Sequence, residues 1–182
     1  MSRLFPALLA TLAALPAAAQ TVTGDTAAAL LFPSKGAEVE MAPGDILPKD
    51  QAKMLEMVAK DQPYYAAIAI SPEEGLMSEA TMAAANHHTV EAASAAALAQ
   101  CNAKKKGATD CVIVATVRPE GWEARPLQLS SGATEDFANY SGALAISAMT
   151  GSWGIGNSPE EALAACATKQ EAATDCAVAI QD

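Results

Sequence analysis

The chain has 182 residues, with 11 Lys and Arg against 21 Asp and Glu, which gives a formal net charge of −10. This length suffices for one domain with a core that buries roughly 70% of the unfolded surface. Such an acidic protein repels nucleic-acid phosphates and anionic lipid headgroups, so we expect neither a nucleic-acid partner nor, after signal cleavage, a membrane partner. Apolar residues make up 51% of the chain, but 44 of them are alanine and only eight are aromatic. The core must therefore pack small side chains closely.

Residues 1–19 have the pattern of a secretory signal peptide. A basic head at Arg3 precedes an apolar run, and the small residues Ala17 and Ala19 match the two positions that signal peptidase selects. The apolar run is too short and too interrupted by proline to span a ~30 Å hydrocarbon core comfortably, although a membrane anchor is the alternative. Cleavage between Ala19 and Gln20 would leave 10 basic and 21 acidic side chains, net −11, on a periplasmic or secreted protein.

Residues 20–62 form an N-terminal extension of the mature chain. The segment 20–35 is rich in Thr, Ala and Gly and predicts a weakly ordered lead-in. A short strand over 37–41 ends at a Pro-Gly turn, which is a strong turn signal. Pro48 then suits the first position of a helix that continues to about Ala59.

An internal repeat predicts that residues 63–182 form one duplicated domain. Tyr64–Ser71 resembles Tyr140–Ser147 at an offset of 76, and Ala108–Cys111 recurs letter for letter as Ala173–Cys176 at an offset of 65. Two independent matches in the same order indicate a duplication. The domain divides into copy one, an insert and copy two, at residues 64–118, 119–139 and 140–182.

The sequence of each copy predicts a strand, a turn, a second strand, a helix and a third strand. Ser158 is a strong helix N-cap, because Pro159 takes the first helical position and Glu161 completes a capping box. Thr89 with Glu91 is a weaker version of the same signal. The expected fold class is α+β, with one mainly antiparallel sheet and two pseudo-equivalent helices on one face, built from a duplicated strand-strand-helix-strand unit.

Four cysteines stand at matched positions, at the end of each predicted helix and the start of each closing strand. In an exported chain such cysteines indicate disulfides, and four of them permit three pairings. The repeat favours Cys101–Cys111 and Cys166–Cys176, because each unit then joins its own helix to its own strand. The alternatives are free redox-active thiols and a zinc site, although zinc ligands usually come in pairs roughly two to four residues apart.

His87 and His88 are the only histidines, and imidazole suits general-base or metal chemistry. Adjacent side chains point apart in an extended chain, and no acidic partner stands at helical spacing. We therefore expect the pair to lie in an exposed polar loop. The run Lys104–Lys106 follows a predicted helix end, where cations complement the helix dipole, and we expect it to be solvated.

Other motifs give no sign of catalysis or cofactor binding. Gly154-Ile155-Gly156 lies between a predicted strand and helix, but it lacks the third glycine of a dinucleotide loop and is followed by acidic residues. Glu73 and Glu74 are adjacent in a turn and do not form a converging pair of carboxylates. Trp122 and Trp153 are expected to cover a sheet edge or the margin of the core. We expect no cofactor and no metal.

Several segments together resemble one bacterial family. They are the small-residue strand 65–71, the alanine-rich helix that ends at Cys101, the Asp-Cys strand start at 110–114, and the Gly- and Trp-containing second half over 142–182. With the signal peptide, they are similar to the bacterial domain of unknown function family 4189. The resemblance covers about 64–182, implies an exported protein and implies no catalytic residue. The longer first copy and the turn at 72–75 depart from the family pattern.

The sequence predicts an exported, non-enzymatic module that binds an unidentified protein or envelope component through its sheet face or hairpin loops. One alternative is a small periplasmic hydrolase or inhibitor-type protein that uses His87 or His88 beside an acidic residue. Another is an envelope stress or structural protein without a discrete ligand. The 5-aminolevulinate synthase label that some similar short proteins carry is unsupported, because that reaction needs a pyridoxal-phosphate fold and lysine for which this chain has no motif.

Overall fold

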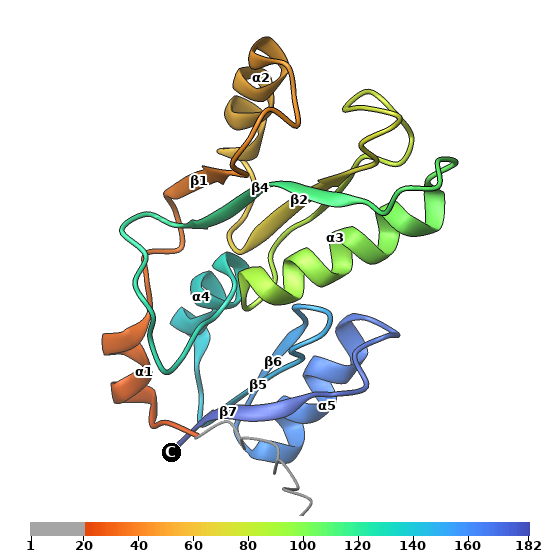
Figure 1. Ribbon diagram of the computed structural model, residues 1–182. Coiled ribbons are helices and arrows are strands. Elements are labelled where there is room, and N and C mark those ends of the chain that lie inside the picture. Colours follow the sequence, from red (N-terminus) through yellow and green to blue (C-terminus); the bar gives the residue numbers. More distant parts are fainter. Residues whose placement is uncertain (1–20) are drawn as a thin grey trace, which may run out of the picture.

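The computed structural model describes residues 21–182, so the predicted signal peptide and the cleavage position at Ala19 and Gln20 lie outside the described residues. The described chain forms an elongated molecule of two halves, one stacked on the other (Figure 1). None of the helices in this range is long and apolar enough to cross a membrane. The elements in chain order are α1 (Gly24–Leu30), β1 (Ala37–Met41), α2 (Lys49–Ala59), β2 (Ala66–Ile70), β3 (Met82–Ala84), α3 (Val90–Lys104), β4 (Val112–Pro119), α4 (Ser131–Asp136), the 3₁₀ turn η1 (Phe137–Asn139), β5 (Ala143–Ile146), β6 (Trp153–Gly156), α5 (Pro159–Lys169) and β7 (Ala177–Gln181).

The strands form two antiparallel sheets, which confirms the α+β class. The strand order is β1-β4-β2-β3 in the first sheet and β6-β5-β7 in the second. The expectation of one sheet with both helices on one face is wrong, because α3 packs on the first sheet and α5 on the second. The reason lies in the N-terminal extension. β1 pairs with the outer edge of β4 from Ala37 opposite Pro119 to Met41 opposite Ala115, so that this part of the edge is closed to a strand of the second half.

The two halves have the same order of elements and the same strand pairing. In each half the first strand is central, the second strand follows it in a hairpin, and the third pairs with its other edge after the helix. A register shift interrupts the β2–β4 ladder between Ile68 and Ala69, and a second one interrupts the β5–β7 ladder between Leu144 and Ala145. These shifts are 76 residues apart, the same offset as the matching strand sequences.

Alternation along the central strands gives each sheet a small-residue face and a larger-residue face. Ala67 and Ala69 pack against α3, and Ala143 and Ala145 pack against α5. The intervening Ile68 belongs to a separate cluster on the opposite face, which includes Leu55 of α2. Side chains as small as alanine let each helix approach its sheet closely. The alanine-rich composition therefore serves the helix–sheet contacts of both halves.

The Gly-x-Gly motif lies inside strand β6 and not between a strand and a helix. A Cβ atom on Gly154 would overlap the backbone nitrogen of Cys166 and the carbonyl oxygen of Ala162, both in α5. A Cβ atom on Gly156 would lie 2.5 Å from the Cβ of Glu161. The glycines are therefore explained by the close approach of the α5 backbone to β6.

The N-terminal extension is more ordered than its composition predicts. The strand over 37–41 and the helix that ends at Ala59 are as expected, except that Pro48 is the N-cap of α2 and Lys49 is the first helical residue. The expectation of an irregular lead-in is wrong, because helix α1 forms there. The Thr23 hydroxyl caps its first turn, and Arg125 Nη1 donates to the carbonyl oxygen of Leu30 at 2.8 Å at its other end. A cation at this position satisfies and complements the free carbonyls of a helix C-terminus.

Candidate functional site

Two disulfides lie at the same end of the two halves. They join Cys101 to Cys111 and Cys166 to Cys176, the pairing that the repeat favours. In each half the bond connects the end of the helix to the residue just before the third strand. Since each sulfur is bonded to another sulfur, neither pair offers thiolates to a metal.

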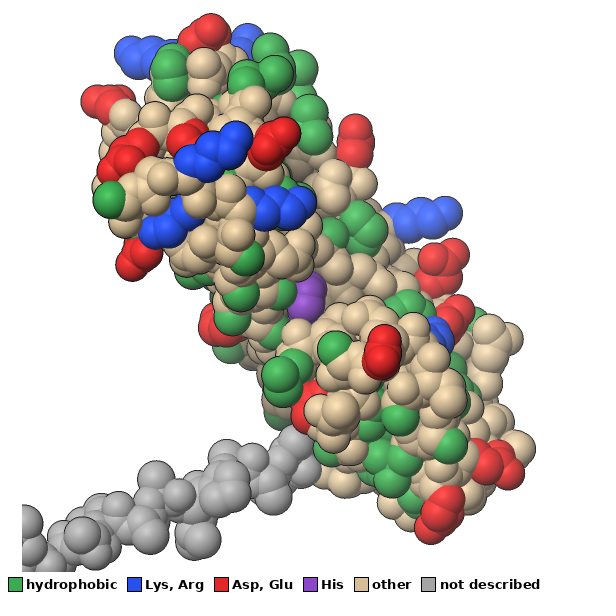
Figure 2. All heavy atoms as spheres, turned by 90° about the vertical axis from the view of Figure 1, so that its right-hand side faces the viewer, with side chains coloured by type: hydrophobic (Ala, Val, Ile, Leu, Met, Phe, Trp, Pro, Cys, Tyr) green, Lys and Arg blue, Asp and Glu red, His purple; other side chains and the backbone are tan. Residues whose placement is uncertain are grey.

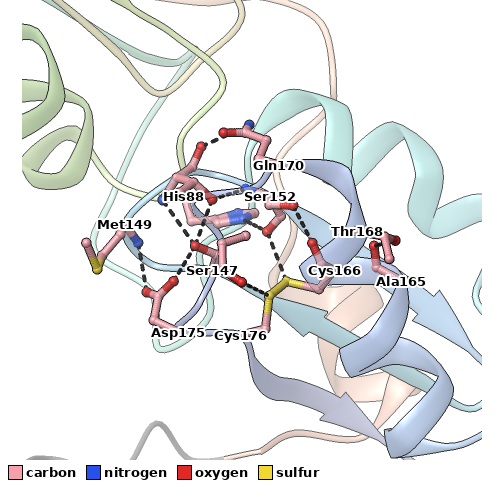
Figure 3. The surroundings of a disulfide bond; sticks show 12 residues. His88, Ser147, Met149, Ser152, Ala165, Cys166, Thr168, Gln170, Asp175 and Cys176 are labelled. Atoms are coloured by element: carbon pink, nitrogen blue, oxygen red, sulfur yellow. Dashed lines mark hydrogen bonds between the residues drawn. A yellow bond between two sulfur atoms is a disulfide. The ribbon is translucent and has the colours of Figure 1, made fainter. Parts of the chain in front are cut away.

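In the second half, Asp175 ties the β5–β6 hairpin to the disulfide loop (Figure 3). The Ser147 hydroxyl donates to Asp175 Oδ1 at 2.5 Å, and the backbone N–H of Met149 donates to Oδ2 at 3.0 Å. Asp175 immediately precedes Cys176, so the disulfide and the carboxylate together fix this loop against the hairpin.

In the first half the two loops exchange roles: the carboxylates lie in the β2–β3 loop, and the N–H donors lie in the disulfide loop. Glu74 Oε1 in the β2–β3 loop accepts from the backbone N–H groups of Lys106 and Gly107, at 2.8 and 3.1 Å. The Glu73 carboxylate accepts from the backbone N–H groups of Ala108 and Thr109, both at 3.1 Å, and from the Thr109 hydroxyl. These hydrogen bonds, with the Thr109 hydroxyl first for Glu73, hold the pKa of both carboxyls below the ordinary value. The adjacent glutamates therefore stabilise a loop.

The lysine run is only partly solvated. Lys104 and Lys106 are exposed, as expected, but the side chain of Lys105 is only 14% exposed. Lys105 Nζ donates to Asp110 Oδ1 at 2.7 Å and to the carbonyl oxygen of Thr109 at 2.9 Å. Lys105 thus closes its own disulfide loop, and the expectation of a fully solvated run is wrong at this residue.

His88 is buried at the boundary between the halves, so the expectation of an exposed loop is wrong. Its side chain lies between the insert and the β5–β6 hairpin (Figure 3). The backbone N–H of Ser130 donates to Nδ1 at 3.1 Å, and Nε2 lies 3.1 Å from the carbonyl oxygen of Ser152. Because Nδ1 accepts, the proton must be on Nε2, which donates to Ser152. Burial lowers the pKa of His88 to about 4.

His87 is buried as well, and its backbone pairs with Tyr65. The N–H of His87 donates to the carbonyl oxygen of Tyr65 at 3.0 Å, and burial lowers the pKa of its ring. Within residues 21–182, neither histidine ring has a hydrogen bond to a carboxylate. Both nitrogens of His88 are already bonded to backbone groups, so the ring cannot accept a proton from a substrate as it stands. The geometry thus favours a structural role for His88.

The neighbouring Asn86 completes this joint between the halves. Its backbone has φ 62°, in the left-handed region that Asn tolerates better than most residues. Its side-chain oxygen accepts from the backbone N–H of Gly132 at 2.9 Å, and its carbonyl oxygen lies against Gly151. We call the segment Asn86–His88 the joint. It is the part of the first half that contacts both the insert and the second hairpin.

Both tryptophans lie at core margins, as expected. Trp153 Nε1 donates to Asp136 Oδ2 at 2.9 Å, and Lys169 Nζ lies 3.3 Å from the centre of its ring. Trp122 packs against the core of the first half, with the Arg118 guanidinium 4.4 Å from its ring centre. Each ring therefore has a cation of its own chain against one face.

An apolar cleft opens beside the joint, between α3 and the β5–β6 hairpin. Figure 2 shows this side of the molecule, where the surface is indented between the halves and a histidine side chain is visible. The main hollow measures about 380 Å³ and is lined by Ala92, Ala95, Ala96 and Ala99 of α3 and by Ala148 and Met149 of the hairpin. A second hollow of about 200 Å³ shares Ala148 and adds polar groups from Thr89 and Gln128. We call these two hollows the interlobe cleft.

The chain was compared with protein families, curated proteins and solved structures. No family model matches the chain, and neither the curated proteins nor the solved structures gave a match. Between residues 21 and 182, no group of three or more His, Cys, Asp or Glu side chains is placed to hold a metal ion. The apolar lining of the interlobe cleft makes it the candidate functional site. No sequence motif marks the cleft, because its walls come from alanines of one half and a hairpin tip of the other.

Proposed function

We propose that the protein is an exported, non-enzymatic binding module, and that the interlobe cleft holds an apolar segment of a partner protein. The observation that carries this proposal is the lining of the main hollow, where all six residues are apolar although the chain as a whole has a net charge of −10. A concave apolar surface beside a few polar groups is the usual form of a binding site.

The walls of the cleft suit an extended or helical peptide. Ala92 and Ala99 are two helical turns apart, about 10 Å along α3. Alanine side chains leave room for another backbone to approach α3 closely. On the opposite wall the Met149 side chain is 65% exposed, and its flexible thioether adapts to side chains of different shapes. Thr89 and Gln128, at the second hollow, are placed to bind the polar backbone of the same segment.

Site-specific photocrosslinking in intact cells tests the proposal. A photoreactive residue at Ala95, in the cleft, should capture a discrete partner, whereas the same residue at Ala103, exposed on α3 but outside the cleft lining, should not. The substitution Ala96→Arg in the Ala95-labelled chain should abolish the crosslink, because the guanidinium fills the main hollow. Equal capture at both positions, or capture that survives Ala96→Arg, would contradict the cleft as the binding site.

Export and duplication are part of the same proposal. The two disulfides support an oxidising compartment, because such bonds persist outside the cytoplasm. The signal-like pattern of residues 1–19 and the resemblance to the family named above point the same way. The matched strand order and the register shifts at Ile68 and Leu144 support an origin of the two halves by duplication. Mass spectrometry of the secreted or periplasmic chain should find Gln20 as its first residue.

A further inference from the structure

Helix α2 has an exposed apolar face that no element within residues 21–182 covers. The described surface has six large apolar side chains in the exposed class, and four of them lie on α2 or just before it: Ile46, Met54, Met57 and Val58, which are 41, 56, 63 and 54% exposed. The last three are spaced i, i+3 and i+4, so they share one face of the helix. Leu55 and Ala59 bury a different face against the first sheet. In Figure 1, α2 projects from the end of the molecule.

The charges on this helix differ from those of the rest of the protein. Its segment 49–61 has three basic and three acidic side chains, net zero, whereas the other described residues have seven basic and 18 acidic side chains, net −11. All six charged side chains of the segment 49–61 are exposed, and none of them forms an ion pair within residues 21–182. They are Lys49, Asp50, Lys53, Glu56, Lys60 and Asp61. Two copies of this chain can approach here without the net repulsion that operates elsewhere.

The order of these charges is self-complementary when the helix is reversed. If a second α2 runs antiparallel about a centre at Leu55, Lys49 lies opposite Asp61 of the second copy, and Asp50 lies opposite Lys60 of the second copy. A parallel arrangement would instead place each charge beside its own kind. We propose that α2 is a self-association surface through which two copies form a twofold-symmetric, antiparallel helix pair around Met54, Met57 and Val58.

The size of the surface sets the strength of this dimer. A helix of 11 residues is about 16 Å long, so the pair buries less than the roughly 1,600 Å² of a standard stable interface. The dimer should therefore dissociate on dilution. Twofold symmetry uses each ionic contact twice, so that one charge reversal disturbs two pairs at once.

A charge-swap experiment tests the pairing in the oxidised mature chain. Sedimentation equilibrium should show a monomer–dimer equilibrium, and Asp50→Lys and Lys60→Glu should each weaken it by about tenfold or more because like charges then meet. The double variant Asp50→Lys/Lys60→Glu should restore association. Asp50 lies in the first turn of α2 and Lys60 is its C-cap, about 15 Å apart along the helix axis, so the restoration cannot arise from a contact within one copy.

A second arm tests the apolar centre with a matched control. Met57→Gln should weaken the dimer, while Met77→Gln should not, because Met77 is 88% exposed in the β2–β3 loop and is not part of α2. Unfolding curves should show that every variant is folded. The proposal is overturned if the chain is monomeric at all concentrations, if the single reversals leave association unchanged, if the double variant fails to restore it, or if both methionine variants act alike.

Discussion

His88 and Ser152 connect the two halves through a hydrogen bond of 3.1 Å from Nε2 to the backbone carbonyl oxygen, while the N–H of Ser130 occupies Nδ1. Both ring nitrogens are therefore used, one as a donor and the other as an acceptor. Only the neutral imidazole fits this arrangement, because a proton on Nδ1 would face the Ser130 N–H. The contact is one of several between the halves, and it requires an uncharged ring.

Stability should fall in mild acid because of His88. Its pKa drops from 6.5 to about 4 on folding, so the unfolded chain binds the proton first as the pH falls. The free energy of unfolding therefore has its full value above pH 6.5, decreases as the pH falls from 6.5 toward 4, and is not changed further by this ring below pH 4. The total decrease is about 3 kcal/mol. Urea unfolding between these pH values measures it. His88→Gln should flatten the slope more than His87→Gln, and equal slopes in both variants would contradict the assignment.

Each disulfide should stabilise its own half. Both bonds join residues ten positions apart, so loss of either should lower the free energy of unfolding by about 3 kcal/mol on the chain-entropy account. The paired variants Cys101→Ser/Cys111→Ser and Cys166→Ser/Cys176→Ser, each compared with the parent in urea, test this. If one paired variant loses much of its free energy of unfolding and the other loses none, the prediction that each disulfide stabilises its own half is wrong.

Gly154→Ala should be strongly destabilising. The new methyl group would overlap the backbone of α5 at Ala162 and Cys166, and backbone atoms of a packed helix cannot move aside as a side-chain end can. We expect a cost of about 3 kcal/mol or more in urea unfolding. Gly132→Ala is the matched comparison and should cost less. Its Cβ would lie 2.8 Å from the edge of the Trp153 ring, which is a side chain and not a helix backbone, and alanine favours the helix more than glycine does. Similar costs at both glycines would argue against close α5–β6 contact.

The glutamate tie in the first half should show itself in hydrogen exchange. Glu73→Gln and Glu74→Gln weaken the acceptors for the N–H groups of residues 106–109, so those amides should exchange faster. The pKa of both carboxyls is lowered, so in the parent chain the protection should persist below the pH at which an ordinary glutamate protonates. Glu171→Gln, at an exposed residue of the second half, should leave these amides unchanged.

Strand positions and the start of α5 followed from local patterns, and the disulfide partners followed from the internal repeat. The apolar runs after Tyr64 and Tyr140 became the central strands, since runs of this kind are buried wherever a helix covers a sheet. The capping box at Ser158 marked the start of α5, where the hydroxyl accepts from the backbone N–H of Glu161. Such signals act over a few residues and do not depend on the rest of the fold.

Features that depend on distant contacts were not predictable. Helix α1 is too short to be stable alone, and its position is set by packing of Ala27 against the second half and by Arg125, about a hundred residues away. The split into two sheets depends on which strand β4 accepts at its outer edge, and β1 supplies it. Burial of His88 likewise depends on the backbone of Ser130 and Ser152, which no sequence spacing relates to it.

The confinement of each sulfur–sulfur bond to one half has a consequence for how the protein is made. A chain that emerges from its N-terminus presents Cys101 and Cys111 before either later cysteine is available. The first bond can then form without competition, and the second pair follows with no wrong partner left to choose. Correct pairing would therefore follow from the order of emergence, with no need for a later step that reshuffles the bonds.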